Sequence, residues 1–130
     1  MVEEKSLITL IESIDKSFSE ILTILKAMAN DKRLKIMASL LTGEKSFDTL
    51  KKETNLQKTA LANHLSMLID CALIEKPDHG KYKLTDDGDL FIRTFEGAFT
   101  QSNIWKKKKS ESVQKRKFSD VFVKDFFQRG

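Results

Sequence analysis

The stretch 47–71, FDTLKKETNLQKTALANHLSMLIDC, has the residue pattern of two helices joined by a short turn. It predicts a short helix over 47–53 capped by Ser46, a tight turn at 54–56, and a second helix over 57–71. Apolar residues recur at helical spacing: Phe47 and Leu50 form the apolar face of the first helix, and the second is expected to bury Leu61, Leu65, Leu68 and Ala72.

A long periodic segment, residues 6–29, precedes this pair of helices. Its apolar residues are spaced alternately by four and three: Leu7, Ile11, Ile14, Phe18, Ile21, Leu25 and Met28. The spacing predicts a heptad-like seam sustained over about six turns of helix. The segment is longer than a small core can cover, which favours a dimerisation helix with Leu7, Ile11, Ile14, Phe18, Ile21 and Leu25 at the interface. The alternative is a helix packed into its own domain.

A further helix is expected between this segment and the pair. Asn30 is a good N-cap, Asp31 suits a first helical turn, and Gly43 suits the residue after a helix end. They bracket a helix over 31–42. Its predicted buried face consists of Leu34, Met37, Ala38 and Leu41.

After this pair of helices, the spacing of the apolar residues changes from a helical period of 3.6 residues to a strand period of 2 residues. This change predicts two short strands at 73–76 and 81–84, joined by a four-residue turn at 77–80. Thr85 then caps a long helix that reaches Trp105 at its furthest. The apolar face of that helix is expected to be Leu90, Phe91, Thr94, Phe95, Ala98 and Phe99.

The predicted order is helix, helix, helix-turn-helix, hairpin, helix. We therefore expect a mainly α fold with a small β-hairpin, a winged helix-turn-helix with extended N- and C-terminal helices. Residues 1–105 would form this domain, and residues 106–130 a basic, Phe-rich extension.

The face of helix 57–71 opposite its leucines suits contact with base edges in a DNA major groove. Gln and Asn can pair with adenine, Thr and Ala can contact a thymine methyl, and Lys can reach guanine or phosphate. The candidates for reading bases are Gln57, Lys58, Thr59, Ala62 and Asn63. Ser66 lies on the same face and is a candidate for a phosphate contact. His64 adjoins Leu61 and Leu65, so its role is either a phosphate or groove-edge contact or a packing hydrogen bond.

The run from 24 to 85 resembles the ArsR-type winged-helix transcriptional regulators of bacteria and archaea. The points of match are LKAMANDKRLKIMASLL across the first two helices, TALANHLSML in the recognition helix, and LI with GKYKLT through the wing. The resemblance implies a homodimer on a two-fold symmetric DNA operator, usually as a repressor, with the terminal helices as the dimer interface.

The chain departs from the metal-sensing members of that family. The stretch 46–50 has no Cys pair, and the last predicted helix has no His. At position 63 the chain has Asn where many members have Arg. Neither a metal nor a cofactor is therefore expected, and no motif identifies an effector.

Basic residues near the two helices of the helix-turn-helix, on the predicted hairpin and at the start of the tail are candidates for phosphate contacts. They are Lys32, Arg33, Lys51, Lys52, Lys76, His79, Lys81, Lys83, Lys106 and Lys107. Residues 106–130 carry nine Lys or Arg against three acids, a net charge of +6. This tail could grip flanking DNA, dock its Phe118, Val121, Phe122 and Phe126 on a partner subunit, or lie on an anionic membrane.

Composition excludes several other classes. A single Cys71 excludes an internal disulfide framework and is expected to be buried. The opening MVEEKSLITL does not have the pattern of a signal peptide, and no run is long and apolar enough to span a membrane, so a cytoplasmic location is expected. No catalytic constellation is present, which argues against an enzyme. The alternatives to a regulator are an architectural DNA-binding protein and a protein-interaction adaptor of the transcription machinery.

Overall fold

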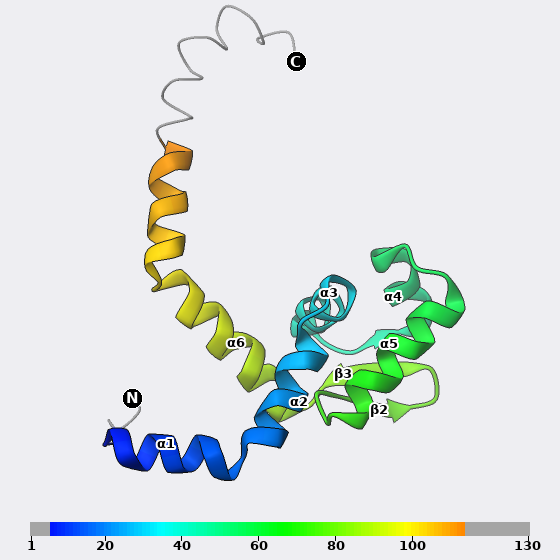
Figure 1. The fold of residues 1–130 in the computed structure, drawn as a ribbon. Coiled ribbons are helices and arrows are strands. Elements are labelled where there is room, and N and C mark those ends of the chain that lie inside the picture. The colour runs from blue at the N-terminus through cyan, green and yellow to red at the C-terminus, as the bar shows by residue number, and fades with distance from the viewer. Residues whose placement is uncertain (1–5, 114–130) are drawn as a thin grey trace, which may run out of the picture. The chain divides into compact units, whose positions relative to one another are not determined.

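The computed structural model describes residues 6–113. These residues form six named α-helices and a small sheet, with a further helical stretch over 103–113 (Figure 1). The order of elements is α1 (Leu7–Lys16), α2 (Phe18–Met28), α3 (Asp31–Ser39), η1 (Leu40–Thr42), β1 (Lys45–Ser46), α4 (Phe47–Thr54), α5 (Lys58–Asp70), β2 (Ile74–Asp78), β3 (Lys81–Leu84) and α6 (Asp86–Thr100). The mainly α winged helix-turn-helix expected from the sequence is confirmed. The contacts within the chain divide it into two compact units, with the boundary after Leu90.

The long N-terminal helix expected over 6–29 is two helices, and the prediction of one uninterrupted seam is wrong. The chain leaves helical geometry at Ser17, whose φ of −116° and ψ of 21° end α1 and begin α2. The Ser17 N–H still bonds the carbonyls of Ser13 and Ile14, so the backbone stays satisfied through the break. Apolar spacing does not detect the break because the apolar residues continue on both sides of it.

Helix α3 begins where the sequence predicts. The Asn30 side chain accepts hydrogen bonds from the backbone N–H groups of Lys32 and Arg33, and Asp31 occupies the first turn. The last turn tightens into η1 and ends at Gly43, whose φ of 128° suits glycine. The predicted buried face is wrong except for Met37: the buried residues are Ile36, Met37 and Leu40, while Leu34, Ala38 and Leu41 are exposed.

The helix-turn-helix forms as predicted. The Ser46 hydroxyl accepts the Thr49 N–H to cap α4, and Asn55 adopts the left-handed conformation (φ 55°) that ends it. Helices α3, α4 and α5 contact one another pairwise. Their core contains the fully buried side chains of Ile36, Met37, Leu50, Leu61, Leu65 and Leu68.

The C-terminal end of α5 differs from expectation at two residues. Ala72, predicted to be buried, is exposed and has a φ of 58°. It reverses the chain in a Schellman arrangement, in which the Leu73 N–H bonds the Leu68 carbonyl and the Ala72 N–H bonds the Ile69 carbonyl. Cys71, also expected to be buried, is only half-buried.

The hairpin is longer than predicted and belongs to a three-stranded sheet in the order β1-β3-β2. Strand β2 continues to Asp78, so the predicted four-residue turn at 77–80 is reduced to His79 and Gly80, whose φ is 72°. Strand β1 was not expected from the sequence. It pairs Lys45 with Tyr82 and therefore fixes the helix-turn-helix to the wing.

Helix α6 begins at a tight junction with the end of α5. The Thr85 hydroxyl donates to the Ala72 carbonyl (2.6 Å) and accepts the Gly88 N–H (2.9 Å). A Cβ at Gly88 would lie 2.0 Å from the Leu73 carbonyl oxygen, so this position requires glycine. The Thr85 cap predicted for this helix is thus confirmed.

The last predicted helix ends earlier than Trp105. Helix α6 ends at Thr100, and a new helical stretch begins at 103 because the Ser102 hydroxyl donates to the Phe99 carbonyl and accepts the Trp105 N–H. The predicted apolar face of α6 is exposed throughout: Leu90, Phe91, Thr94, Phe95, Ala98 and Phe99. Ile92, which was not expected on it, is the buried residue. The tail residues Phe118, Val121, Phe122 and Phe126 lie outside the described residues.

Candidate nucleic-acid interface

The outer face of α5, defined as Gln57, Lys58, Thr59, Ala62 and Asn63, is exposed at every position. It lies opposite the buried stripe of Leu61, Leu65 and Leu68 because helical residues three or four apart share one side. Gln57 is the N-cap residue, yet its side chain makes no capping hydrogen bond. The structure therefore brings together all five residues predicted to read bases, and Ser66 is exposed as well.

The N-terminal end of α5 lacks the acidic residue found in the first turns of α3, α4 and α6, which hold Asp31, Asp48 and Asp86. In this respect α5 is like α1, whose first turn has no acid either. The positive end of the α5 dipole therefore has no carboxylate beside it in its own first turn.

His64 lies at the flank of the buried stripe and is half-buried. Its Nδ1 is 3.3 Å from Nη1 of Arg33. Because a guanidinium only donates, Nδ1 is the acceptor in this bond and the ring proton is on Nε2. Of the two roles left open by the sequence, the structure provides direct contacts for the packing hydrogen bond.

The two basic residues at the start of α3 are held inside the protein's own structure. Arg33 also donates to the Ala27 carbonyl (2.6 Å) and the Lys26 carbonyl (3.3 Å) at the end of α2. Lys32 donates to the Thr54 carbonyl (3.3 Å) at the end of α4. Both side chains thus satisfy helix C-terminal carbonyls, so they are weaker candidates for phosphate contacts than the sequence predicted.

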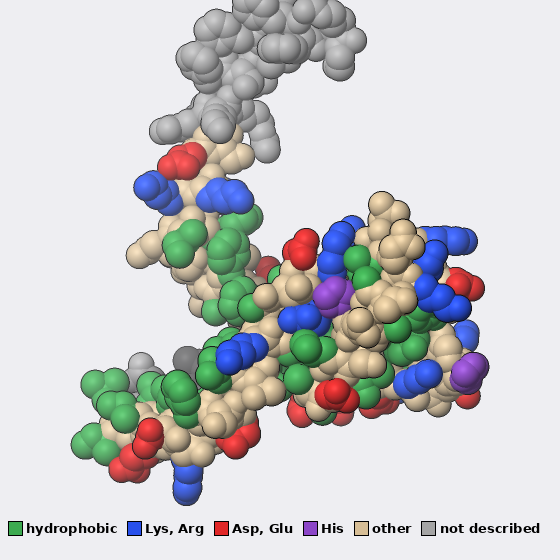
Figure 2. All heavy atoms as spheres, turned by 45° about the vertical axis from the view of Figure 1, so that its right-hand side comes forward, with side chains coloured by type: hydrophobic (Ala, Val, Ile, Leu, Met, Phe, Trp, Pro, Cys, Tyr) green, Lys and Arg blue, Asp and Glu red, His purple; other side chains and the backbone are tan. Residues whose placement is uncertain are grey.

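Lys51 and Lys52 lie exposed near the end of α4. Together with Asp48, Asn55 and Leu56 they line a shallow depression beside the turn that leads into α5. Figure 2 shows Lys and Arg side chains gathered over the part of the body that contains α4 and α5.

The wing's basic residues fall into two kinds. Lys76 lies over the Tyr82 ring, with Nζ 5.7 Å from the centroid, and Lys83 forms an ion pair with Glu75 at 3.4 Å. Within residues 6–113 no such partner is found for the exposed side chains of His79 and Lys81. The tip of the hairpin therefore presents Lys81 and His79 without the competing partners that Lys76 and Lys83 have.

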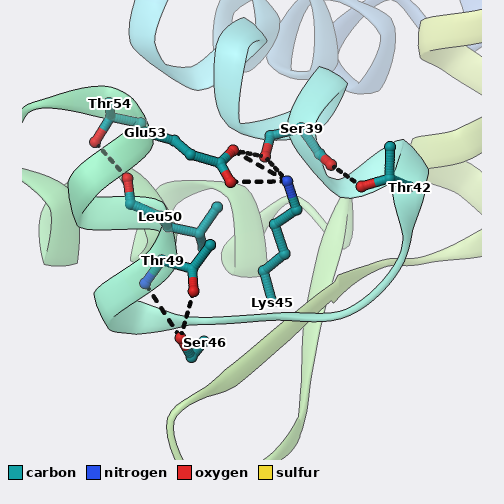
Figure 3. A network of polar contacts seen from close by, with 8 residues as sticks. All are labelled: Ser39, Thr42, Lys45, Ser46, Thr49, Leu50, Glu53 and Thr54. Atoms are coloured by element: carbon teal, nitrogen blue, oxygen red, sulfur yellow. Dashed lines mark hydrogen bonds and ion pairs between the residues drawn. The ribbon is translucent and has the colours of Figure 1, made fainter.

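Sequence reasoning missed a polar network that supports this site. Figure 3 shows Lys45 between Glu53 and Ser39, with Nζ 2.8 Å from Glu53 Oε2 and 2.7 Å from Ser39 Oγ. The Ser39 hydroxyl donates to Glu53 as well. The hydrogen bonds from Lys45 and Ser39 hold the pKa of Glu53 below its ordinary value. The network joins α3, β1 and α4, and no local pattern in the sequence predicts it.

Within the described part of the chain, no three His, Cys, Asp or Glu side chains converge to hold a metal ion. The same residues include no helix with the length and hydropathy needed to cross a membrane.

A bihelical core with an uncapped, polar outer helix face and an adjoining hairpin defines a winged helix-turn-helix domain. Residues 30–76 match the model of the family described as bacterial regulatory protein, arsR family. The transcriptional activator HlyU of Vibrio cholerae is 36% identical over 58 residues, which are 45% of this chain and 54% of that protein. The alignment thus spans about half the length of this relative.

Solved structures give the same result. HlyU from Vibrio cholerae N16961 superposes with a TM-score of 0.57 at 29% identity, covering 66% of this chain and 98% of that one. A homodimeric winged helix-turn-helix DNA-binding domain from Mycobacterium bovis, at 18% identity and a TM-score of 0.59, shares the fold over 78% of this chain and 92% of its own. Residues 30–76 are therefore similar in sequence to the arsR-family regulatory domain, and 66% of the chain shares the fold of HlyU.

Proposed function

We propose that the chain is a sequence-specific, double-stranded DNA-binding transcriptional regulator that acts as a homodimer. The observation that carries this proposal is the outer face of α5, whose five side chains are all exposed above a fully buried leucine stripe. A helix of this kind fits the major groove, where side chains from its N-terminal half reach the base edges.

The outer face supplies the chemistry that base recognition needs. The amides of Gln57 and Asn63 can each donate to and accept from adenine, Thr59 and Ala62 can contact a thymine methyl, and Lys58 can reach guanine. None of these five side chains is used in a hydrogen bond or ion pair within residues 6–113. Their hydrogen-bonding groups are thus available to bases.

Residues that precede and follow α5 in the sequence would contact the DNA backbone. Lys51 and Lys52 lie before it, and His79 and Lys81 lie at the wing tip after it. Phosphate contacts of this kind fix the register of a protein on DNA without carrying sequence information. Lys76 and Lys83 would contribute less because Tyr82 and Glu75 already engage them.

The homodimer is proposed from the N-terminal seam, defined as Leu7, Ile11, Ile14, Phe18, Ile21 and Leu25. All six side chains are exposed, and even the least exposed, Ile21, has 40% of its surface open to solvent. Figure 2 shows hydrophobic side chains in the open along α1. Large apolar side chains exposed in this number on α1 and α2 favour an interaction site. The homodimeric state of the Mycobacterium bovis domain is consistent with a second copy as the partner.

Selection from a random duplex library with the purified full-length protein tests the proposal. We expect an enriched two-fold symmetric motif with half-sites about 10 bp apart, the spacing at which a dimer meets one face of DNA. Binding without enrichment would instead indicate an architectural protein, and the absence of binding would indicate an adaptor.

The double variant Lys58→Ala with Asn63→Ala then tests the assignment of the reading helix. It should lose most of the preference for the selected motif, by a factor of about 10 to 100, and keep salt-sensitive binding. Asp70→Ala, at the opposite end of α5, is the matched control and should keep the preference. A double variant with unchanged preference would mean that another element reads the bases.

A further inference from the structure

The helical stretch over 103–113 carries four consecutive lysines, Lys106 to Lys109, and one acid, Glu111. All four lysines are exposed. The stretch starts at the Ser102 cap, and the Trp105 ring packs on Phe99 with 5.8 Å between ring centroids. The lysines are therefore displayed on an ordered helix whose first turn is anchored to the end of α6.

The arrangement of charge around this helix is unusual. Successive residues in an α-helix are about 100° apart, so four consecutive lysines cover about 300° of the circumference. Figure 2 shows Lys side chains projecting on opposite sides of this segment. The exposed apolar residues Ile104 and Val113 are nine positions apart and lie on opposite sides as well, about 180° from each other. The helix thus has neither a cationic side nor an apolar side.

This arrangement discriminates between polyanionic partners. A helix that lies on an anionic membrane needs a continuous apolar face to bury, and this one has none. A flat acidic surface would meet only the lysines on one side. The major groove of DNA is about 12 Å wide and admits a helix, with phosphates along both of its walls. Only a partner with phosphates on two sides uses all four lysines.

We infer that helix 103–113 is a second DNA-binding element, which enters a groove of the duplex outside the segment read by α5 and contacts phosphates on both walls. It adds affinity without base recognition, because a lysine-to-phosphate contact carries no sequence information. The inference rests on the proposed function for its DNA partner.

The test measures the salt dependence of binding by the full-length chain, with the selected duplex and with a duplex of random sequence as probes. The first variant replaces Lys106, Lys107, Lys108 and Lys109 by Gln, which has a similar helix propensity. The slope of log Kobs against log[KCl] should fall in magnitude by about 0.9 for each lost phosphate contact, and by at least about 2 per protomer. Preference for the selected motif should stay unchanged.

A second variant keeps the charge and composition but gathers the lysines on one side. It combines Asn103→Lys, Lys108→Asn, Lys109→Ser and Ser110→Lys, which places the four lysines within about 100° of the circumference. If the wild-type lysines contact phosphates on both walls of the groove, the salt slope of this variant should lie between the slopes of the wild type and the four-Gln variant. Circular dichroism and thermal unfolding check that both variants keep the wild-type fold.

Three results would overturn the inference. One is an unchanged slope in the four-Gln variant. Another is a one-sided variant that equals the wild type, since that indicates a flat contact. The third is binding to phosphatidylglycerol vesicles that the four-Gln variant loses while its DNA slope stays unchanged. A wild-type chain that selects no motif would refute the proposed function instead, and the random duplex would still report on this helix.

Discussion

The Arg33 guanidinium donates from Nη1 to Nδ1 of His64 at 3.3 Å and, through its other nitrogens, to the carbonyls of Lys26 and Ala27. One side chain therefore joins the end of α2 to the middle of α5. Since α2 carries half of the N-terminal seam and α5 carries the reading face, Arg33 ties the proposed dimer helix to the proposed DNA-reading helix.

Replacing Arg33 by Lys should destabilise the fold by about 1 to 2 kcal/mol, because an ammonium cannot reproduce the planar fork that reaches three acceptors. Chemical denaturation measures the loss, and Lys16→Ala, an exposed cation at the end of α1, is the control. His64→Leu in the Arg33→Lys background should cost less than the sum of the two single changes, because one of the three Arg33 bonds is lost in both. Fully additive losses would show that Arg33 and His64 act independently.

The wing offers a matched pair of lysines on one strand. Lys81→Gln should weaken DNA binding and lower the salt slope by about 0.9, because its ammonium has no competing partner in the described residues. Lys83→Gln removes the same charge but should have a smaller effect, because Glu75 already pairs with it. Titration of a labelled duplex at several KCl concentrations compares the two. Equal effects would contradict this ranking.

Ile14→Asp combined with Ile21→Asp should produce monomers in light scattering. Both side chains are exposed in the protomer, 43% and 40%, so the charges are expected to disrupt association rather than folding. Thr9→Asp with Thr23→Asp adds the same two charges on the other side of α1 and α2, and this control should stay dimeric. If the Ile variant remains a dimer, the interface lies elsewhere, for example on the exposed face of α6.

Stability should depend on the Glu53 carboxylate at acidic pH. Because its pKa is lowered in the folded state, its contribution is complete above the ordinary value of 4.5 and is lost as pH falls through the folded pKa. The Glu53 side chain is 35% exposed, so solvent screening limits the effect to about 1 kcal/mol. Glu53→Gln should remove this part of the acid-induced loss in urea unfolding as the pH is lowered below 4.5.

The control for that experiment is Glu75→Gln, which breaks the more exposed pair with Lys83. It should leave the pH dependence close to that of the wild type, because a pair that is half exposed on both sides contributes little. Identical pH profiles for Glu53→Gln and the wild type would exclude the network of Figure 3 as the cause.

The sequence was sufficient where a local signal determines the structure. The caps at Asn30 and Ser46, the leucine stripe of α5 and its exposed outer face are each encoded within a few residues. The buried face of α3 was not predictable in this way. Its two candidate stripes, one through Leu34 and one through Ile36, are both apolar, and only packing against α4 and α5 selects between them.

The remaining differences also come from tertiary contacts. Strand β1 has two residues, too few to show a period, and forms because Lys45 meets Tyr82 on β3. Which cations are engaged could not be predicted either, because the partners of Arg33 and Lys32 are far away along the chain. Sequence patterns find the surface that a ligand could meet, whereas the structure shows which charges are already used.

The close approach of Gly88 to the Leu73 carbonyl restricts movement between the first turn of α6 and the end of α5. Packing that leaves no space for one methyl group also leaves no space for these segments to slide past each other. The hydrogen bond from the Thr85 hydroxyl to the Ala72 carbonyl holds them together as well. The first turn of α6, the root of the wing and the end of α5 therefore behave as one rigid piece. A rotation of this first turn would therefore be transmitted directly to α5, the proposed DNA-reading helix.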